Sequence, residues 1–158
     1  LKEVIFSIIN DFIHDKMILD VFCGSGSLGI EALSRGASHV TFIEKEEASI
    51  RILNKNVNNL KLDAEHIRIV RSDALDFLKS TQNKYHLIFS DPPFKYLSVQ
   101  HMVNQVFKSD ILEMPGLLVV HHEIDNPIQT ESVTYELLKQ KKVGRSILSF
   151  LSKEKNSG

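Results

Sequence analysis

The residues of this chain best suited to chemistry gather around a turn rich in glycine. An apolar run from Met17 to Phe22 is followed by Gly24, Gly26 and Gly29, with the spacing G-x-G-x-x-G. Glycine suits such a turn because the backbone needs angles closed to other residues, and because a Cβ would keep a ligand away. The helical pattern that begins at Ile30 would point unpaired N–H groups at whatever lies above the turn.

A carboxylate follows the second apolar run of the chain. Val40 to Ile43 ends at Glu44, twenty positions after Gly24, and a carboxylate at the tip of the second strand can accept hydrogen bonds from both hydroxyls of a ribose. Together these features predict a nucleoside-cofactor site. The alternative is that the glycines only pack a helix on a strand and that Glu44 is merely solvated. A nicotinamide dehydrogenase and a methyltransferase would share this much of the pattern.

The run Asp91-Pro92-Pro93-Phe94 separates those two classes. Two successive prolines hold the chain extended, and Pro92 is kept out of the helical region by the proline that follows it. Its carbonyl can therefore point into a site. A carboxylate, a carbonyl and an aromatic ring are presented together at the carboxyl end of a strand, the edge at which open α/β sheets bind ligands. This combination of residues argues against the nicotinamide dehydrogenase, which is an oxidoreductase.

The elements that position these residues alternate between strand and helix patterns joined by short connections. Continuous apolar strand patterns indicate strands buried on both faces, so we expect one doubly wound α/β domain with a mostly parallel seven-stranded sheet and helices on both faces. A hairpin around Val143-Gly144-Arg145 would close the sheet edge. The expected strands are 17–22, 39–43, 67–70, 85–89, 117–120, 133–142 and 146–151, and the expected helices include 46–60 and 99–108.

Length and composition place limits on the whole chain. With 158 residues, 42% hydrophobic content and 4 prolines, it suits one well-packed domain, which we expect to span 1–152 with a disordered tail at 153–158. One cysteine excludes an internal disulfide framework, and the absence of a long apolar run or signal peptide favours a cytoplasmic protein. A net charge of −1 means that any nucleic acid must be met by a local basic patch.

Five segments, in order and at suitable distances, carry a resemblance to a known family. The chain resembles the RsmD family of bacterial 16S rRNA guanine-N2 methyltransferases, within the class I S-adenosylmethionine-dependent enzymes that have a D-P-P-F/Y motif. The resemblance implies a Rossmann-like class I methyltransferase domain. The segments are Asp20 to Ala37, with its Glu31-Ala32-Leu33-Ser34-Arg35-Gly36-Ala37, then Glu44-Lys45, Ser72-Asp73-Ala74-Leu75, Asp91 to Phe94, and Gly144-Arg145-Ser146.

The resemblance also implies a role for each matching residue. The glycine turn would hold the methionine part of S-adenosylmethionine, with Asp20 near its amino group, Glu44 on the ribose, and Asp73 with Ala74 on the adenine edge. The catalytic set would be Asp91, Pro92, Pro93 and Phe94, which hold a guanine flipped out of the RNA. The full set expected at the cofactor is Asp20, Cys23, Gly24, Gly26, Gly29, Glu44, Lys45, Asp73, Ala74 and Asp91.

The implied reaction transfers a methyl group to the guanine N2 amino group and leaves S-adenosylhomocysteine. The implied partner is 16S rRNA, within an assembled or assembling small ribosomal subunit, and the protein is expected to be a monomer without a metal or membrane. The same motif also serves methyltransferases of adenine in nucleic acid or of glutamine in protein. A nicotinamide-dependent oxidoreductase and a non-catalytic scaffold are more remote alternatives.

Several residues have a plainer interpretation beside the functional one. Asp73 could be only a helix N-cap, Phe94 core filler, and Asp20 a structural acceptor under the glycine turn. Cys23 is expected to be a small buried residue rather than a nucleophile, because nitrogen methylation needs no covalent intermediate.

Two further groups are open to more than one interpretation. In His121-His122-Glu123 the two histidines point to opposite faces of a strand, so no metal is assigned. The basic residues expected to contact RNA phosphates, or alternatively to guard a solvated edge hairpin, are Lys139, Lys141, Lys142 and Arg145.

The start of the chain departs from the family pattern. The chain begins at Leu1 without a methionine, already inside a helical pattern whose apolar residues share one face. Members of the family usually have a basic N-terminal segment ahead of this helix, which helps to close the cofactor pocket and to meet the RNA. We therefore expect sequence to be missing upstream, and activity of the 158-residue form is an open question.

Overall fold

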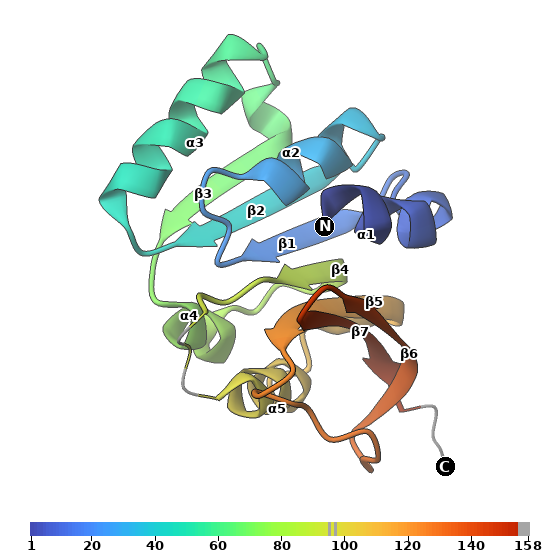
Figure 1. Cartoon of the computed structure of the whole chain (residues 1–158). Coiled ribbons are helices and arrows are strands. Elements are labelled where there is room, and N and C mark those ends of the chain that lie inside the picture. The colour runs from blue at the N-terminus through green and yellow to red at the C-terminus, as the bar shows by residue number, and fades with distance from the viewer. Residues whose placement is uncertain (95, 97, 155–158) are drawn as a thin grey trace.

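The computed structural model describes residues 1–94, 96 and 98–154, which form one seven-stranded sheet with helices on both faces (Figure 1). In these residues no helix is both long and apolar enough to cross a membrane. The elements are α1 (Lys2–Ile9), the 3-10 helix η1 (Asn10–Phe12), β1 (Met17–Val21), α2 (Ser27–Ser34), β2 (His39–Glu44), α3 (Glu47–Asn59), the 3-10 helix η2 (Ala64–His66), β3 (Ile67–Arg71), α4 (Ala74–Ser80), β4 (Tyr85–Ser90), α5 (Val99–Lys108), β5 (Leu112–Glu123), β6 (Tyr135–Val143) and β7 (Ser146–Lys153).

The order of the strands creates a binding edge in the middle of the sheet. The order is β3-β2-β1-β4-β5-β7-β6, in which the first five strands are parallel and β7 pairs antiparallel with both β5 and β6. The chain moves outward from β1 to β3 and then crosses back to β4. The crevice between β1 and β4 is therefore the topological switch point, where sheets of this type bind ligands at the carboxyl ends of their strands.

Alternate residues of the strands build two separate cores, one on each face of the sheet. On one face α1, α2 and α3 contribute Ile5, Ala32 and Leu53 to a cluster with strand residues such as Phe42 and Phe89. On the other face α4 and α5 pack against the opposite side chains of the same strands. Figure 1 shows the two groups of helices on opposite sides of the sheet. This double coverage explains the continuous apolar strand patterns.

The predicted doubly wound sheet and its C-terminal hairpin are confirmed, but the strand limits differ. Strands β2, β3 and β4 each run one residue further than predicted, and β6 is Tyr135–Val143 rather than 133–142. Larger differences in β1 and β5 have local causes. The first strand ends at Val21 rather than at Phe22, because Phe22 takes a positive φ of 59° and turns the chain. The fifth begins at Leu112 rather than at 117. In the pairing with β4, Leu112 lies opposite Tyr85 and Leu117 lies opposite Leu87, so β5 contains extra residues in a bulge between these pairs. Such an irregularity interrupts the alternation of side chains by which a strand is recognised in the sequence.

The end of the chain differs slightly from expectation. Strand β7 continues to Lys153, one residue beyond the predicted end of the domain, because Lys153 still pairs with Tyr135 of β6. Lys153 also forms an ion pair with Asp110, 2.8 Å between nitrogen and oxygen. The predicted disordered tail otherwise falls mainly on residues 155–158, which lie outside the described residues.

Candidate active site

The glycine turn between β1 and α2 has the backbone conformation that its sequence predicts. Gly24 and Gly26 have φ values of 56° and 88°, in the left-handed region that favours glycine. The turn is closed by a hydrogen bond from the Gly26 N–H to the carbonyl of Cys23, 2.9 Å long. A Cβ added to Gly24 would meet no atom within 4 Å. The space above Gly24 is therefore open, as a ligand-binding turn requires.

The third glycine of the turn has a packing role. A Cβ on Gly29 would overlap the ring of Phe42, and it would lie only 2.9 Å from Cγ1 of Val40. Glycine at this position lets α2 pack closely on β2. The Gly29 N–H donates a hydrogen bond of 3.0 Å to Oδ2 of Asp20, which is buried. Asp20 thus acts as a structural acceptor under the turn, one of the two roles considered from the sequence.

Burial gives Asp20 unusual protonation behaviour. The pKa of its carboxyl is raised from 3.8 to about 7, chiefly because burial penalises the charged form, and nearby Asp91 and Glu44 raise it further. The hydrogen bond from Gly29 opposes this shift. A carboxyl with this pKa changes charge near neutral pH.

Glu44 is held in place by backbone N–H groups from two segments. Its Oε1 accepts a hydrogen bond from Gly24 at 2.9 Å, and its Oε2 accepts from Lys45 at 3.1 Å and from Glu46 at 2.9 Å. The carboxylate therefore links the glycine turn to the start of α3. Because each carboxylate oxygen has about two acceptor positions, Oε1 keeps one for a further donor.

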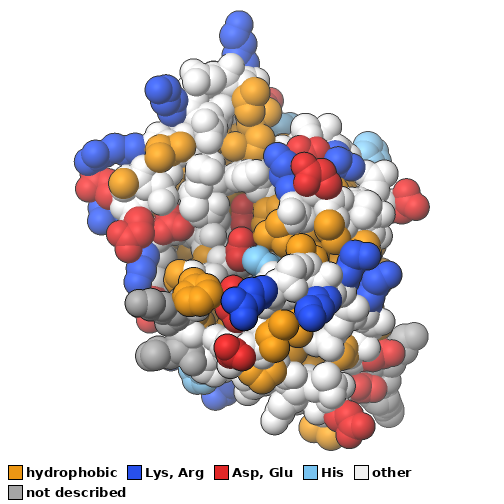
Figure 2. All heavy atoms as spheres, in the orientation of Figure 1, with side chains coloured by type: hydrophobic (Ala, Val, Ile, Leu, Met, Phe, Trp, Pro, Cys, Tyr) orange, Lys and Arg blue, Asp and Glu red, His pale blue; other side chains and the backbone are white. Residues whose placement is uncertain are grey.

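A pocket of about 310 Å³ lies above these residues, at the carboxyl ends of β1, β2 and β4. Figure 2 shows acidic side chains within a furrow near the middle of this face. Of the predicted cofactor residues, the pocket brings together Glu44, Lys45, Asp73, Ala74 and Asp91. Asp20, Cys23, Gly24, Gly26 and Gly29 form or support the neighbouring turn and do not line this pocket.

Two aromatic residues that sequence reasoning missed form part of the pocket wall. The rings of Phe22 and Tyr96 meet edge to face, with centroids 5.1 Å apart at 73°. Burial, and the nearby Asp73 carboxylate, raise the pKa of Tyr96. Asp73 also caps α4, since its Oδ2 accepts a hydrogen bond from the Asp76 N–H at 3.1 Å. The capping role expected as an alternative is therefore present, and Asp73 still faces the pocket.

A second hollow of about 220 Å³ lies on the other side of the Asp91-Pro92-Pro93-Phe94 motif. Asp91 and Pro93 line both hollows, so the motif forms the partition between them. Phe94 is 74% exposed, which excludes a role as core filler. Among the residues that the structure describes, none donates a hydrogen bond to the Pro92 carbonyl, whereas the Pro93 carbonyl accepts one from Tyr96 at 2.9 Å.

Asp91 contacts a histidine that the sequence had suggested only as an unlikely metal ligand. Oδ1 of Asp91 lies 2.9 Å from Nδ1 of His121, whose Nε2 lies 2.7 Å from Oγ of Ser146. His122 makes separate contacts, with its Nε2 2.8 Å from Oγ of Ser149. Within residues 1–94, 96 and 98–154, no group of three possible ligands is arranged to hold a metal ion.

Cys23 and the basic hairpin occupy the remaining predicted positions. The Cys23 thiol is buried, and burial together with the Asp20 and Glu44 carboxylates raises its pKa, so the reactive thiolate is disfavoured. The basic residues lie on β6 and its turn, and all of them are exposed: Lys139, Lys141, Lys142 and Arg145. In Figure 2 lysine and arginine side chains gather over the β6–β7 hairpin, beside the acidic furrow.

Comparison with known proteins identifies the family. A family model described as "Conserved hypothetical protein 95" matches residues 1–152. A relative from Haemophilus influenzae, named "Ribosomal RNA small subunit methyltransferase D", is 38% identical over 145 residues, covering 90% of this chain and 75% of that protein. The relative of the same name from Escherichia coli K12 is 34% identical over 144 residues, covering 91% and 72%. The chain belongs to the RsmD family.

The solved structures agree with this assignment of the RsmD family. The chain superposes on "Putative methyltransferase yhhF from Escherichia coli" with a TM-score of 0.88 and 32% identity, covering 98% of this chain and 86% of that one. The class I methyltransferase fold implied by the five matching segments is thereby confirmed.

The residues of this RsmD-family chain that sequence reasoning missed are placed by the fold and not by a local sequence pattern. Phe22 enters the pocket through a positive φ, and Tyr96 is held by Asn126, whose Nδ2 donates to the Tyr96 carbonyl at 2.9 Å. Asn126 also accepts a hydrogen bond from the Val99 N–H at 3.2 Å. These contacts join segments about thirty residues apart, so no local spacing could indicate them. Of the residues around the motif that were given no role at the site, only His121 and His122 were noticed in the sequence, as possible metal ligands.

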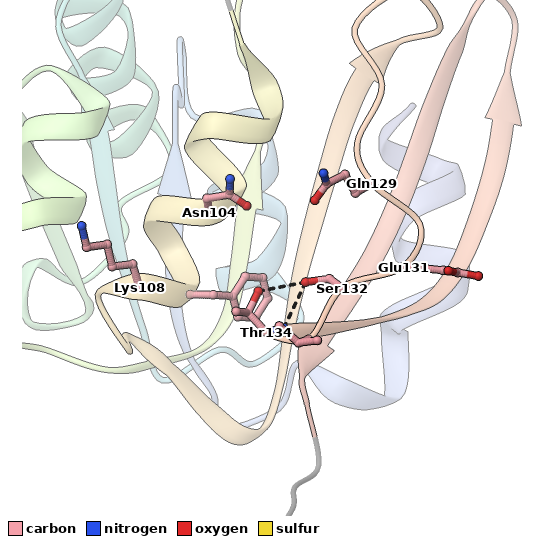
Figure 3. A pocket seen from close by; sticks show the side chains of 8 residues that line it. Asn104, Lys108, Gln129, Glu131, Ser132 and Thr134 are labelled. Atoms are coloured by element: carbon pink, nitrogen blue, oxygen red, sulfur yellow. Dashed lines mark hydrogen bonds between the residues drawn. The ribbon is translucent and has the colours of Figure 1, made fainter.

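A further hollow of this RsmD-family domain lies away from the motif. It has a volume of about 820 Å³ and lies between α5 and the segment 129–134 (Figure 3). Its lining includes the apolar side chains of Phe107 and Val133, and Ser132 and Thr134 already share a hydrogen bond of 2.9 Å. None of the predicted site residues lines it.

Proposed function

We propose that this chain transfers a methyl group from S-adenosylmethionine to the N2 amino group of a guanine in 16S ribosomal RNA. The coarser activity, S-adenosylmethionine-dependent methylation of ribosomal RNA, is that of the RsmD family, whose relatives in Haemophilus influenzae and Escherichia coli carry the name small subunit methyltransferase. The observation that supports the finer proposal is the partition formed by Asp91 and Pro93, which separates a pocket for the donor from a hollow for the acceptor.

The residues of the first pocket fit an adenosyl cofactor. Glu44 has an acceptor position left for a ribose hydroxyl, Asp73 and Ala74 line the wall expected to meet the adenine, and Phe22 with Tyr96 supplies aromatic surface. The open space above Gly24 admits the methionine part. S-adenosylmethionine supplies the methyl group as a sulfonium cation, and the carboxylates at this edge stabilise that positive charge.

Asp91 and Pro92 are suited to holding an exocyclic amino group. The lone pair of the guanine amino nitrogen is delocalised into the ring, so the site must localise it. Hydrogen bonds from the two amino protons to the Asp91 carboxylate and to the Pro92 carbonyl localise the lone pair and stabilise the positive charge that grows on nitrogen. Among the described residues that line the second hollow, Asp91 and Glu123 supply two carboxylates and none is a lysine or an arginine. That lining suits the adjacent N1–H and N2–H donors of guanine.

Phe94 offers a stacking surface for the base. Its exposed ring stands at the edge of the second hollow. Stacking of a base on an aromatic side chain contributes about 1–3 kcal/mol, which is comparable with the few kcal/mol that extruding the base costs. The basic residues of the β6–β7 hairpin then hold the RNA backbone without reading its sequence.

The proposal is tested by identifying the methylated product. Assembled small subunits that lack the modification are incubated with labelled S-adenosylmethionine, and the nucleosides and proteins are separated by mass spectrometry. We expect N2-methylguanosine in the 16S rRNA. N6-methyladenosine, or label in protein glutamine, would replace the guanine proposal by one of the alternatives.

Asp91→Ala is expected to lower the rate of methyl transfer by about 100-fold or more, because the stabilisation of positive charge on the acceptor nitrogen is lost. Binding of S-adenosylhomocysteine, measured by calorimetry, should change little. Asp125→Ala, at an exposed residue beyond β5, is the matched control. Full turnover by Asp91→Ala would contradict the role of the motif.

Glu44→Ala tests the donor side of the same site. The substitution removes an acceptor for the ribose and releases three backbone N–H groups, so we expect S-adenosylhomocysteine to bind at least about tenfold more weakly in calorimetry. Glu65→Ala, at an exposed carboxylate of η2, is the control. Binding of NAD by the wild type in place of the adenosyl compounds would overturn the assignment of this pocket.

A further inference from the structure

The Asp91 carboxylate has an anchor whose role the methyl-transfer chemistry described so far leaves out. Nδ1 of His121 lies 2.9 Å from Oδ1 of Asp91, and Nε2 of the same ring lies 2.7 Å from Oγ of Ser146. His121 is near the end of β5, whereas Ser146 begins β7. The imidazole ring therefore spans from the motif to a neighbouring strand and contacts a polar atom at each end.

If Asp91 is ionised, the partners of the ring decide which way it donates, because a carboxylate can only accept. Oγ of Ser146 also lies 2.9 Å from the carbonyl of Val143. If the hydroxyl donates to that carbonyl, Nε2 must donate to Oγ, and the ring carries both protons. If the hydroxyl donates to Nε2 instead, the ring is neutral with its proton on Nδ1. In both arrangements Nδ1 donates to an ionised Asp91.

The anchor matters because nothing else described in the structure orients this carboxylate. The prolines fix the backbone after Asp91, but they leave its side-chain torsion free. The Asp91 side chain is 40% exposed, whereas the His121 side chain is only 22% exposed and is held at both ends. The ring thus contacts one oxygen of a more exposed carboxylate, and no described residue donates a hydrogen bond to Oδ2.

We propose that His121 is a positioning residue for Asp91. By holding Oδ1, it turns Oδ2 toward the amino group of the base in the second hollow, which His121 also lines. This inference rests on the proposed function, because it assigns the free oxygen to the acceptor nitrogen. It acts on the geometry of methyl transfer and leaves the donor pocket unchanged, since His121 does not line that pocket.

Two substitutions by amides test the contacts of the two ring nitrogens separately. In His121→Asn the amide nitrogen can occupy the place of Nδ1 and still donate to Asp91. In His121→Gln the longer amide reaches the place of Nε2 and keeps only the contact with Ser146. The control is His101→Gln, at an exposed residue of α5.

We expect His121→Gln to lower kcat for small-subunit methylation by about 10-fold to 100-fold, because a small misplacement of a reacting group has effects of that size. His121→Asn should recover most of the rate. The affinity for S-adenosylhomocysteine and the unfolding temperature should stay close to those of the wild type in both variants. Equal rates in the two variants, or a parallel loss of cofactor affinity, would overturn the proposal.

A second measurement does not depend on which substrate is methylated. Nitrogen NMR of the His121 ring reports which nitrogen carries a proton, and we expect a proton on Nδ1 that changes its shift in Asp91→Ala but not in Asp125→Ala. An unprotonated Nδ1 beside an ionised Asp91 would overturn the inference, whether or not guanine proves to be the substrate. Absence of RNA methylation by the wild type would instead count against the proposed function alone.

Discussion

Asp20 shows how one buried residue can combine a structural role with sensitivity to pH. Its hydrogen bond to the Gly29 N–H fixes the start of α2 under the glycine turn. The run Asp20 to Gly29 could be recognised in the sequence, but the raised pKa could not. That pKa depends on burial and on two carboxylates from other segments, Glu44 at the end of β2 and Asp91 just after β4.

The raised pKa of Asp20 predicts that the stability of the ligand-free protein falls as pH rises. The folded state binds a proton more tightly than the unfolded chain, so this contribution is fully present below about pH 3.8 and is lost as the pH rises to about 7. Its size is of the order of a few kcal/mol. Thermal or urea unfolding between pH 5 and pH 8 should show a decline in the wild type that is reduced in Asp20→Asn. The same decline in both proteins would contradict this prediction.

Some residues of the pocket walls could be predicted from the sequence, and others could not. Glu44, Asp73 and Asp91 could be placed at one sheet edge because each follows an apolar run, and parallel strands end at the same edge. Phe22, His121 and Asn126 could not be placed in this way. Their roles depend on a backbone angle or on contacts across about thirty residues.

At the scale of elements, the β1–α2–β2 unit separates the roles of its glycines. Gly24 has a left-handed backbone and open space around its Cα, whereas Gly29 is surrounded by the side chains of β2. The spacing G-x-G-x-x-G predicted that the unit exists. The sequence could not show which glycine faces a ligand and which faces the core, because that depends on the packing of α2.

Two alanine substitutions in this unit should therefore have different effects. Gly29→Ala should destabilise the fold by about 1–3 kcal/mol through overpacking against Phe42 and Val40. Gly24→Ala should cost about 1 kcal/mol of backbone strain and should also weaken binding of S-adenosylhomocysteine, because the new methyl group occupies the open space. Urea unfolding and calorimetry on both variants measure the two effects. A larger loss of stability in Gly24→Ala than in Gly29→Ala would contradict this division.

The fold itself was largely predictable from its strand and helix patterns, and the exceptions have local causes. The five parallel strands have apolar runs that stop at polar or glycine residues, so their order along the chain was clear. The first part of β5 was missed because Pro115 and the bulge before Leu117 interrupt the pattern. Proline cannot donate to a strand ladder, so a strand that contains it is hidden from such analysis.

At the scale of the whole molecule, charge is distributed unevenly although the net charge is −1. Acidic side chains lie in the furrow, and the basic residues of the β6–β7 hairpin lie beside it (Figure 2). A uniformly basic surface would bind any RNA, whereas here the basic residues of the hairpin are grouped beside the acidic furrow. Under the proposed function, we expect the hairpin to favour an RNA that already presents its base at the furrow.

Replacing Lys139, Lys141 and Lys142 together by alanine should weaken binding to small subunits and reduce its dependence on salt. The slope of log affinity against log salt should become shallower by about one for each phosphate contact that is lost. Lys55, Lys61 and Lys79, which lie in or beside α3 and α4, provide a triple control. An unchanged slope would assign the hairpin to guarding a solvated sheet edge instead.

The partition formed by Asp91 and Pro93 has a consequence for inhibitor chemistry. Because the two hollows of about 310 and 220 Å³ share these walls, the proposed function predicts that one molecule joining an adenosine to a purine by a short tether occupies both. Such a bisubstrate compound gains from the high effective concentration of its second half once the first is bound. Its optimal tether length would also measure the distance over which the methyl group travels.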